Sequence, residues 1–125
     1  AAMVELAQAV VIKNQEPDGI ITRAQDYIRQ NFRKDISLEE VARTVGISRY
    51  YFSKLFKEEA GMNFTEYLTG IRIETAKRLL SERELSIKQV CVDSGYANPN
   101  YFSRIFKKWV GITPTEFRDG VGEDH

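Results

Sequence analysis

The chain has 125 residues, enough for one domain or two very small ones, with one cysteine (Cys91) and one histidine (His125). A disulfide framework, a metal centre and a histidine-based catalytic site are not expected, because the ligands and bases that such sites need are missing. The 18 basic residues balance the 18 acidic ones. Only the distribution of charge can therefore argue for nucleic-acid binding.

The composition is that of a folded, soluble protein, with 42% hydrophobic and 29% charged residues. The longest apolar run, residues 9–12, is too short to span a bilayer, and no basic region precedes it as in a signal peptide. The sequence predicts a cytoplasmic protein that does not use a membrane as a partner.

The first 19 residues are expected to be a linker or stub. Residues 3–13 have the composition of a helix, and residues 16–19 (EPDG) form a strong break after it. Two interpretations stay open, a partly ordered stub or the end of a linker to an upstream domain outside this chain. Residues 20–32 then carry apolar side chains at helical spacing and predict a helix that packs on the segment after it.

An internal duplication of about 50 residues organises the rest of the chain. Residues 51–57 (YFSKLFK) recur as residues 101–107 (YFSRIFK). Each copy reads as a short helix, a turn at a glycine (Gly46 or Gly95) that can take a positive φ, and a second helix. The predicted caps are Ser37 with Glu40 in a capping box and then Ser48 in the first copy, and Ser86 with Gln89 and then Asn98 in the second.

Residues 64–81 lack proline and carry apolar side chains at helical spacing, which predicts one long connecting helix with room for a bend at Gly70. Residues 114–118 predict a short helix, and residues 120–125 are expected to fray. We therefore expect an all-α fold of about seven helices, plus the possible N-terminal one. It comprises two helix-turn-helix subdomains, residues 20–62 and 83–119, joined by a connecting helix over residues 63–82.

In the second helix of each copy, apolar residues at i, i+3 and i+4 mark the side that faces the core. The remaining side chains are basic or carry hydrogen-bonding groups, and residues 98–110 contain no acidic residue. The residues predicted to be buried are Phe52, Leu55 and Phe56 in the first copy, and Phe102, Ile105, Phe106 and Trp109 in the second.

The outward faces have the chemistry that reads a DNA major groove. Arginine and lysine donate to guanine, asparagine pairs with adenine, and serine suits either base, while lysines farther along a helix neutralise phosphates. A merely solvated basic face is the alternative, and the repetition of the arrangement argues against it. The predicted base contacts are Arg49, Tyr50, Ser53, Lys54, Asn98, Asn100, Ser103 and Arg104, and the predicted phosphate contacts are Lys57, Lys107 and Lys108.

The length of the connecting helix suggests how the two copies would be used. About 18 helical residues extend about 27 Å. With the width of the flanking helices added, the two second helices approach the ~34 Å that separates successive turns of the major groove. One chain is thus expected to grip two turns on the same side of a duplex. Because the two faces differ in sequence, the preferred site should lack two-fold symmetry.

These motifs resemble the C-terminal DNA-binding domain of AraC/XylS-type bacterial transcription regulators over residues 20–118. The most specific parts are residues 95–96, 100–108 (NYFSRIFKK) and 111–118 (GITPTEFR). The resemblance implies two helix-turn-helix subdomains among seven helices, recognition helices in adjacent major grooves, and neither catalysis nor a cofactor. The implied base contacts are Tyr50, Ser53 and Lys54, and Asn100, Tyr101, Ser103 and Arg104, so that Tyr101 enters only through the resemblance.

Two positions depart from the family pattern. Lys54 stands where arginine is common, which gives up bidentate geometry toward guanine, and Pro99 replaces a polar residue that often makes a contact. The family also implies a separate ligand-sensing, dimerising or phosphoacceptor domain and contact with RNA polymerase. This fragment is expected to be a monomer, with the oligomeric state of a longer protein left open.

Two rival functions stay open at the level of sequence. One is a helical module that docks its basic faces on an acidic protein. The other is a repair methyltransferase that carries such a domain, which would require an activated cysteine. Cys91 corresponds to Ala42 of the first copy, so that a small packing residue is expected there.

Overall fold

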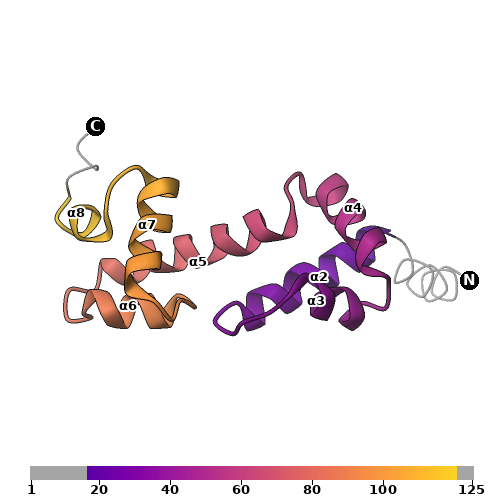
Figure 1. Cartoon of the computed structure of the whole chain (residues 1–125), viewed down its shortest axis with the longest axis horizontal. Coiled ribbons are helices and arrows are strands. Elements are labelled where there is room, and N and C mark those ends of the chain that lie inside the picture. The colour runs from indigo at the N-terminus through magenta and orange to yellow at the C-terminus, as the bar shows by residue number, and fades with distance from the viewer. Residues whose placement is uncertain (1–16, 121–125) are drawn as a thin grey trace, which may run out of the picture. The chain divides into compact units, whose positions relative to one another are not determined.

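The computed structural model describes residues 17–120, which are helical with short connecting turns and contain no strand (Figure 1). This confirms the all-α expectation, with α3–α4 and α6–α7 as the two helix-turn-helix motifs. The expected N-terminal helix over residues 3–13 and most of the tail fall outside the described residues. The helices are α2 (Pro17–Asn31), α3 (Leu38–Thr44), α4 (Arg49–Ala60), α5 (Phe64–Leu80), α6 (Ile87–Asp93), α7 (Pro99–Val110) and α8 (Pro114–Arg118).

Helix α2 begins at Pro17, so the predicted break is wrong for residues 17–19. Proline is well tolerated in the first turn of a helix, where its fixed φ suits the helix and its missing N–H has no partner to lose. Ile20 and Ile21 are both buried, which ties this end of α2 to the core. None of the described helices is long and apolar enough to cross a bilayer.

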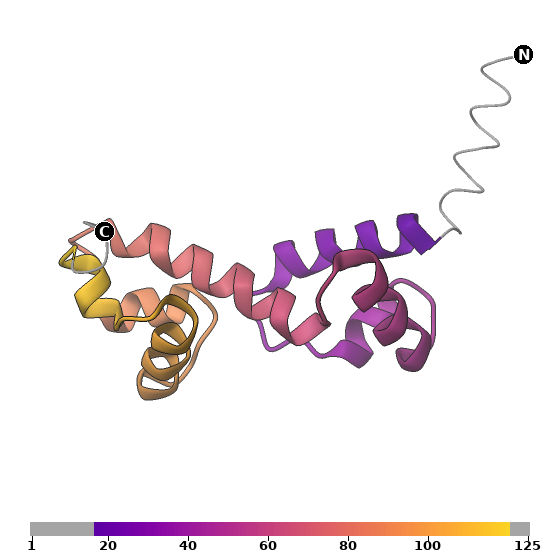
Figure 2. The same ribbon diagram turned by 90° about the horizontal axis from the view of Figure 1, so that it is seen from above.

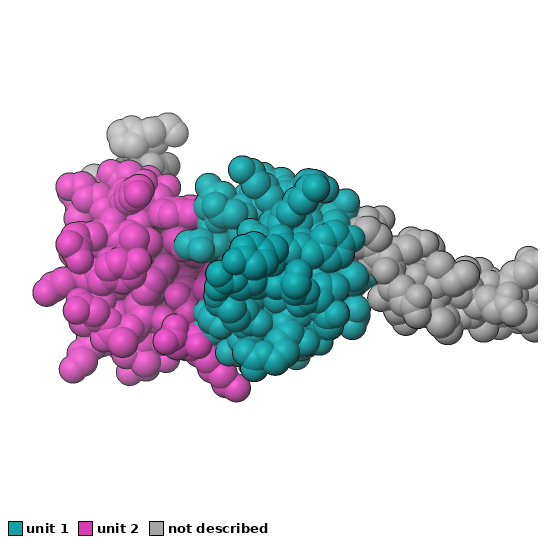
Figure 3. Space-filling model, turned by 45° about the vertical axis from the view of Figure 1, so that its right-hand side comes forward, with its two compact units in different colours: residues 1–31, 36–67 teal, residues 32–35, 68–125 magenta. Residues whose placement is uncertain are grey.

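The contacts divide the described residues into two compact units (Figure 3). The first holds residues 17–31 and 36–67, and the second holds residues 32–35 and 68–120. The boundary falls inside α5, after Tyr67, and α5 runs through Gly70 as one helix.

The core of the first unit lies where α2 packs on α3 and α4 (Figure 2). Phe52, Leu55 and Phe56 are buried as predicted. The ring of Phe56 lies 5.3 Å from that of Tyr67 and 6.4 Å from that of Phe64, in edge-to-face contacts. These buried residues fix the orientation of α4 about its axis, and therefore also determine which side of the helix faces solvent.

The core of the second unit is built on Phe102 and Phe106 of α7, which are fully buried. Ile105 is only partly buried, and the prediction that Trp109 is buried is wrong, because Trp109 is 45% exposed. A β-carbon placed on Gly70 would lie 3.6 Å from the indole. The edge of the indole that carries Cζ3 and Cη2 therefore lies against α5 at Gly70, while the side chain stays partly exposed.

The four predicted N-caps are confirmed: Ser37, Ser48, Ser86 and Asn98 each accept a hydrogen bond from the backbone N–H three residues later. The two predicted capping boxes, Ser37 with Glu40 and Ser86 with Gln89, are only half formed. The Glu40 carboxylate accepts from the Tyr27 hydroxyl instead, and the Gln89 amide donates to Asp93. Reciprocal boxes occur at two sites that the sequence analysis did not single out, Asn63 with Glu66 and Thr113 with Glu116.

Two arginines hold the loops that lead into the helix-turn-helix motifs. The Arg72 guanidinium donates to the carbonyl oxygens of Phe32 and Lys34, at 2.9 and 3.0 Å, ahead of α3. Arg118 donates in the same way to Leu80 and Glu82, at 2.9 and 3.1 Å, ahead of α6. The planar, five-donor guanidinium suits such paired bonds. In each of the two loops it thus hydrogen-bonds two backbone carbonyl oxygens, which holds the backbone ahead of the motif.

Candidate nucleic-acid interface

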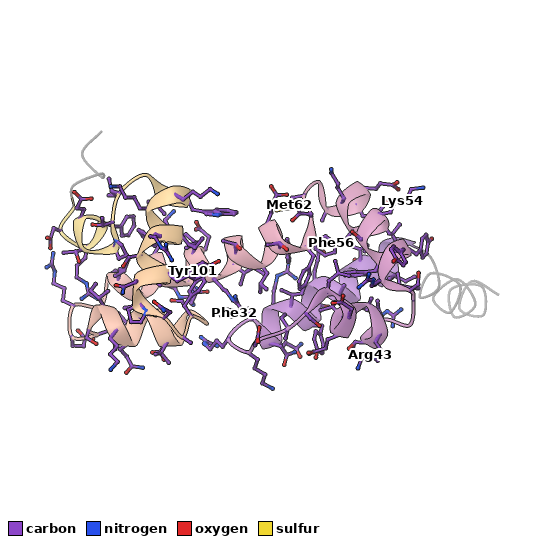
Figure 4. All side chains as sticks on the ribbon, in the orientation of Figure 1. Phe32, Arg43, Lys54, Phe56, Met62 and Tyr101 are labelled. Carbon is purple, nitrogen blue, oxygen red and sulfur yellow. The ribbon has the colours of Figure 1, made fainter. Side chains whose placement is uncertain are left out.

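Helix α4 turns its five predicted contact residues to solvent. Arg49, Tyr50, Ser53, Lys54 and Lys57 are all exposed, Tyr50 to 76%. Lys54 lies on the outer side of the helix whereas Phe56 points into the unit (Figure 4). The buried aromatic stripe thus leaves a face of cations, a hydroxyl and a phenol available for a partner.

Arg49, at the first position of α4, is held from two sides. Its Nη1 donates to the Glu39 carboxylate at 2.8 Å, and its Nη2 donates to the Tyr50 hydroxyl at 3.4 Å. Its guanidinium carbon lies 5.0 Å from the centroid of the Tyr50 ring. The hydrogen bonds to Tyr50 and Glu39 raise the pKa of Arg49, and the backbone N–H of Glu39 together with Arg49 lowers the pKa of the Glu39 carboxyl.

Glu39 of α3 therefore adjoins the outward face of α4 through its contact with Arg49. The pair borders a shallow depression of about 270 Å³, lined by Leu38, Glu39, Arg49, Tyr50 and Ser53. Sequence pattern alone gives no signal for the pair, because its two residues lie on different helices and meet only through the angle between α3 and α4.

Helix α7 presents the second predicted face. Asn100, Arg104, Lys107 and Lys108 are exposed, and Ser103 is half-buried. Asn98 is also exposed, but its side-chain oxygen Oδ1 accepts a hydrogen bond from the Tyr101 backbone N–H at 3.0 Å, as the N-cap of α7. Because the cap uses the amide oxygen, only the NH2 group of Asn98 can donate to a base. We therefore expect a single donated hydrogen bond in place of the two-bond contact of an asparagine with adenine.

Tyr101, which only the family resemblance implies as a base contact, lies between the core and solvent. Its ring centroid lies 6.0 Å from that of the buried Tyr96, and the Arg104 guanidinium lies 5.9 Å from the Tyr101 ring. The side chain is 47% exposed. Tyr101 thus supports Arg104 from one side and can contact a partner with the other.

The two motifs differ in charge. Helices α3 and α4 carry four cations and four carboxylates, whereas α6 and α7 carry four cations and a single carboxylate, Asp93. Because the field of a face depends on its summed charges, α6–α7 attracts a polyanion more strongly than α3–α4 does. Any selective role of α3–α4 has to come from the placement of its groups.

Cys91 is a packing residue. Its thiol is buried and donates to the Tyr96 carbonyl oxygen at 3.3 Å, and burial raises its pKa. No group of potential metal ligands occurs among residues 17–120.

The burial of Cys91 predicts slow reaction with thiol reagents. Because the thiolate is the reactive form, we expect Cys91 to react at least about tenfold more slowly in the native chain than in the chain unfolded by denaturant. Equal rates, measured by the release of a coloured thiol product, would contradict this burial.

Comparison with known proteins identifies the fold. The family described as a helix-turn-helix domain matches residues 41–120. The lactose operon transcription activator of Staphylococcus xylosus is 39% identical over 98 residues, which make up 78% of this chain and 35% of that protein. The regulatory protein PocR of Salmonella typhimurium is 33% identical over 107 residues, 86% of this chain and 35% of that protein. The chain thus spans about a third of the length of these curated relatives.

Solved structures agree with these matches. The C-terminal domain of AraT, a response regulator from Geobacillus stearothermophilus, has a TM-score of 0.77 and 40% identity, covering 80% of this chain and 84% of that one. An AraC-type regulator from Chromobacterium violaceum has a TM-score of 0.76 and 27% identity, covering 86% and 96%. The DNA-binding domain of AdpA, solved with a target DNA, shares the fold at 21% identity and a TM-score of 0.76, covering 80% and 90%.

Proposed function

The chain belongs to the AraC-type family of helix-turn-helix transcription regulators, and from this premise we propose that α4 and α7 are its recognition helices and enter successive major grooves of one asymmetric site. Its task is to bind double-stranded DNA in a sequence-specific way, and not to catalyse a reaction. The proposal assigns base reading to the first turns of each helix and phosphate contact to the lysines farther along.

One observation carries this assignment. Both α4 and α7 bury an aromatic stripe and turn cations and hydroxyl groups to the opposite side, and α7 adds the amide of Asn100. A helix in a major groove needs both features, because its buried side fixes its orientation and its outer side meets base edges. The two outer faces differ in sequence, which supports an asymmetric site.

The direct test is a fluorescence-anisotropy titration with duplexes selected from a random pool. We expect selected duplexes to bind more tightly than unrelated ones by a factor of about 10³ or more, with an affinity that falls steeply as salt rises. The rival function, docking of the basic faces on an acidic protein, predicts no selective binding at micromolar protein. Salt-dependent binding with no preference among duplexes would contradict sequence-specific recognition.

Within the second recognition helix, Arg104 and Lys107 are expected to behave differently. Arg104→Ala should weaken binding to the selected duplex by ~1 to 3 kcal/mol and relax the preference at one base pair. Lys107→Ala should weaken all duplexes alike and reduce the salt slope by about one. Titrations of both variants on selected and unrelated duplexes measure this. Equal, sequence-independent losses would remove Arg104 from base reading.

The remaining features of the complete regulator are proposals that follow from the family. We propose that it acts in the bacterial cytoplasm, contacts RNA polymerase, and carries a sensing, dimerising or phosphoacceptor domain that joins this one near residue 20. The relatives are about three times as long as the matched region, which supports such a domain. We also propose that residues 20–62 and 83–119 form the two subdomains, that residues 63–82 form the connecting helix, and that this chain alone is a monomer.

A further inference from the structure

We propose that Glu39 is a specificity-determining positioning residue, which holds Arg49 at the start of α4 so that its guanidinium reads a base pair and does not settle on any nearby phosphate. The inference deepens the proposed function and rests on it. It concerns a residue of α3, the helix that precedes the recognition helix, and it treats Glu39 as acting through Arg49.

Two hydrogen bonds restrain the Arg49 guanidinium and leave its other N–H donors free. Glu39 engages Nη1 at 2.8 Å, and Tyr50 engages Nη2 at 3.4 Å while its ring lies under the guanidinium. A guanidinium has five N–H donors, so these two bonds leave donors for a base edge. A long arginine side chain held in this way loses less rotamer freedom when it binds DNA than an unrestrained one.

Stability does not explain the pair. The side chains of Arg49 and Glu39 are 53% and 51% exposed, and exposed ion pairs contribute little to folding. A carboxylate on a surface that meets DNA is also unfavourable in itself, because it faces phosphates of the same charge. The first turn of α3 favours a carboxylate at this position in its own right, but that preference does not require an arginine beside it. The pairing with Arg49 therefore points to a role in binding.

The internal repeat shows that this pair is particular to the first motif. Ser37 and Ser86 are equivalent N-caps, which aligns Glu39 with Lys88. Ser48 and Asn98 are equivalent N-caps as well, which aligns Arg49 with Pro99. The second motif thus has a cation, Lys88, in place of Glu39 and a proline, Pro99, in place of Arg49.

This difference suggests a division of work between the motifs. Helices α6 and α7 carry the uncompensated cations that attract any duplex, whereas α3 and α4 carry as many carboxylates as cations. If Arg49 moved to a phosphate, the Glu39 carboxylate would be left unpaired against DNA. If Arg49 reads a base from its place on Glu39, the carboxylate stays neutralised. Glu39 therefore disfavours the wrong duplex, which is one route to specificity.

The test uses the whole chain with Glu39→Gln, Arg49→Gln and the double variant, titrated on the selected duplex and on an unrelated duplex of equal length. For Glu39→Gln we expect tighter binding to the unrelated duplex, a salt slope on it steeper by about one, and a ratio of selected to unrelated affinity about five- to tenfold lower. In the Arg49→Gln background the same substitution should leave the ratio unchanged.

Lys88→Gln is the matched control, because Lys88 occupies the equivalent position of the second motif and should lower both affinities alike. Thermal melting of each variant tests folding, and Glu39→Asp, which keeps the charge on a shorter stem, should give an intermediate ratio. The inference is overturned if Glu39→Gln strengthens both duplexes by the same factor, or if its effect on the ratio persists without Arg49. A wild-type chain that prefers no duplex overturns the proposed function and the inference together.

Discussion

Phe106→Ala is expected to lower the free energy of unfolding by about 3 to 5 kcal/mol, the usual effect of removing a buried aromatic ring. Phe106 is fully buried, and its ring centroid lies 5.9 Å from that of Phe102 and 5.6 Å from that of Phe117. Its loss leaves a cavity behind the outward face of α7. Urea unfolding followed by the fluorescence of Trp109, the only tryptophan in the chain, measures the change.

Tyr101→Ala is the matched control on the same helix. Its ring is 47% exposed and lies beside the buried Tyr96, with 6.0 Å between the ring centroids, so we expect a loss of about 1 kcal/mol. If Phe106→Ala abolishes folding, Phe106→Leu should still show a loss of about 1 to 2 kcal/mol. Equal losses for Phe106→Ala and Tyr101→Ala would contradict the assignment of the buried and outward sides of α7.

Gly95→Ala is expected to cost about 2 to 5 kcal/mol, because it combines backbone strain with a clash. Gly95 has a φ of 101°, which side chains other than hydrogen rarely tolerate. A β-carbon there would lie 2.7 Å from the Phe32 carbonyl oxygen and 2.9 Å from Nε of Arg72. The clash falls on a hydrogen-bonded pair, since Arg72 donates to that same carbonyl at 2.9 Å.

Gly46→Ala separates the two causes. Gly46 occupies the equivalent turn with a φ of 82°, but a β-carbon there would meet no atom within 4 Å. We therefore expect strain alone, about 1 to 2 kcal/mol. Chemical denaturation of both variants provides the comparison, and a Gly95→Ala loss no greater than that of Gly46→Ala would show that residues 32–35 do not pack against this turn.

The helices and their caps could be predicted from the sequence because they depend on local pattern. The aromatic spacing of residues 51–57 fixes which side of α4 is buried, and the serines at 37, 48 and 86 cap their helices within three residues. The exposed positions of the predicted contact residues other than the half-buried Ser103 follow from the same periodicity. Their roles on DNA stay predictions.

The features that the sequence did not reveal all depend on contacts between helices. Trp109 has the spacing of a core residue, but an edge of its indole lies against Gly70 of another helix and the side chain stays 45% exposed. Glu40 has the position of a capping-box partner, yet the Tyr27 hydroxyl lies within its reach. Glu39 and Arg49 carry no joint signal until α3 and α4 are placed together.

We propose that the two recognition helices of one chain engage successive major grooves from the same side of a duplex. Hydroxyl-radical footprinting of the wild-type chain on its selected duplex tests this most directly. We predict two protected patches centred about 10 base pairs apart, with Arg104→Ala weakening one patch more than the other. A single protected patch, or two patches on opposite sides of the duplex, would contradict it.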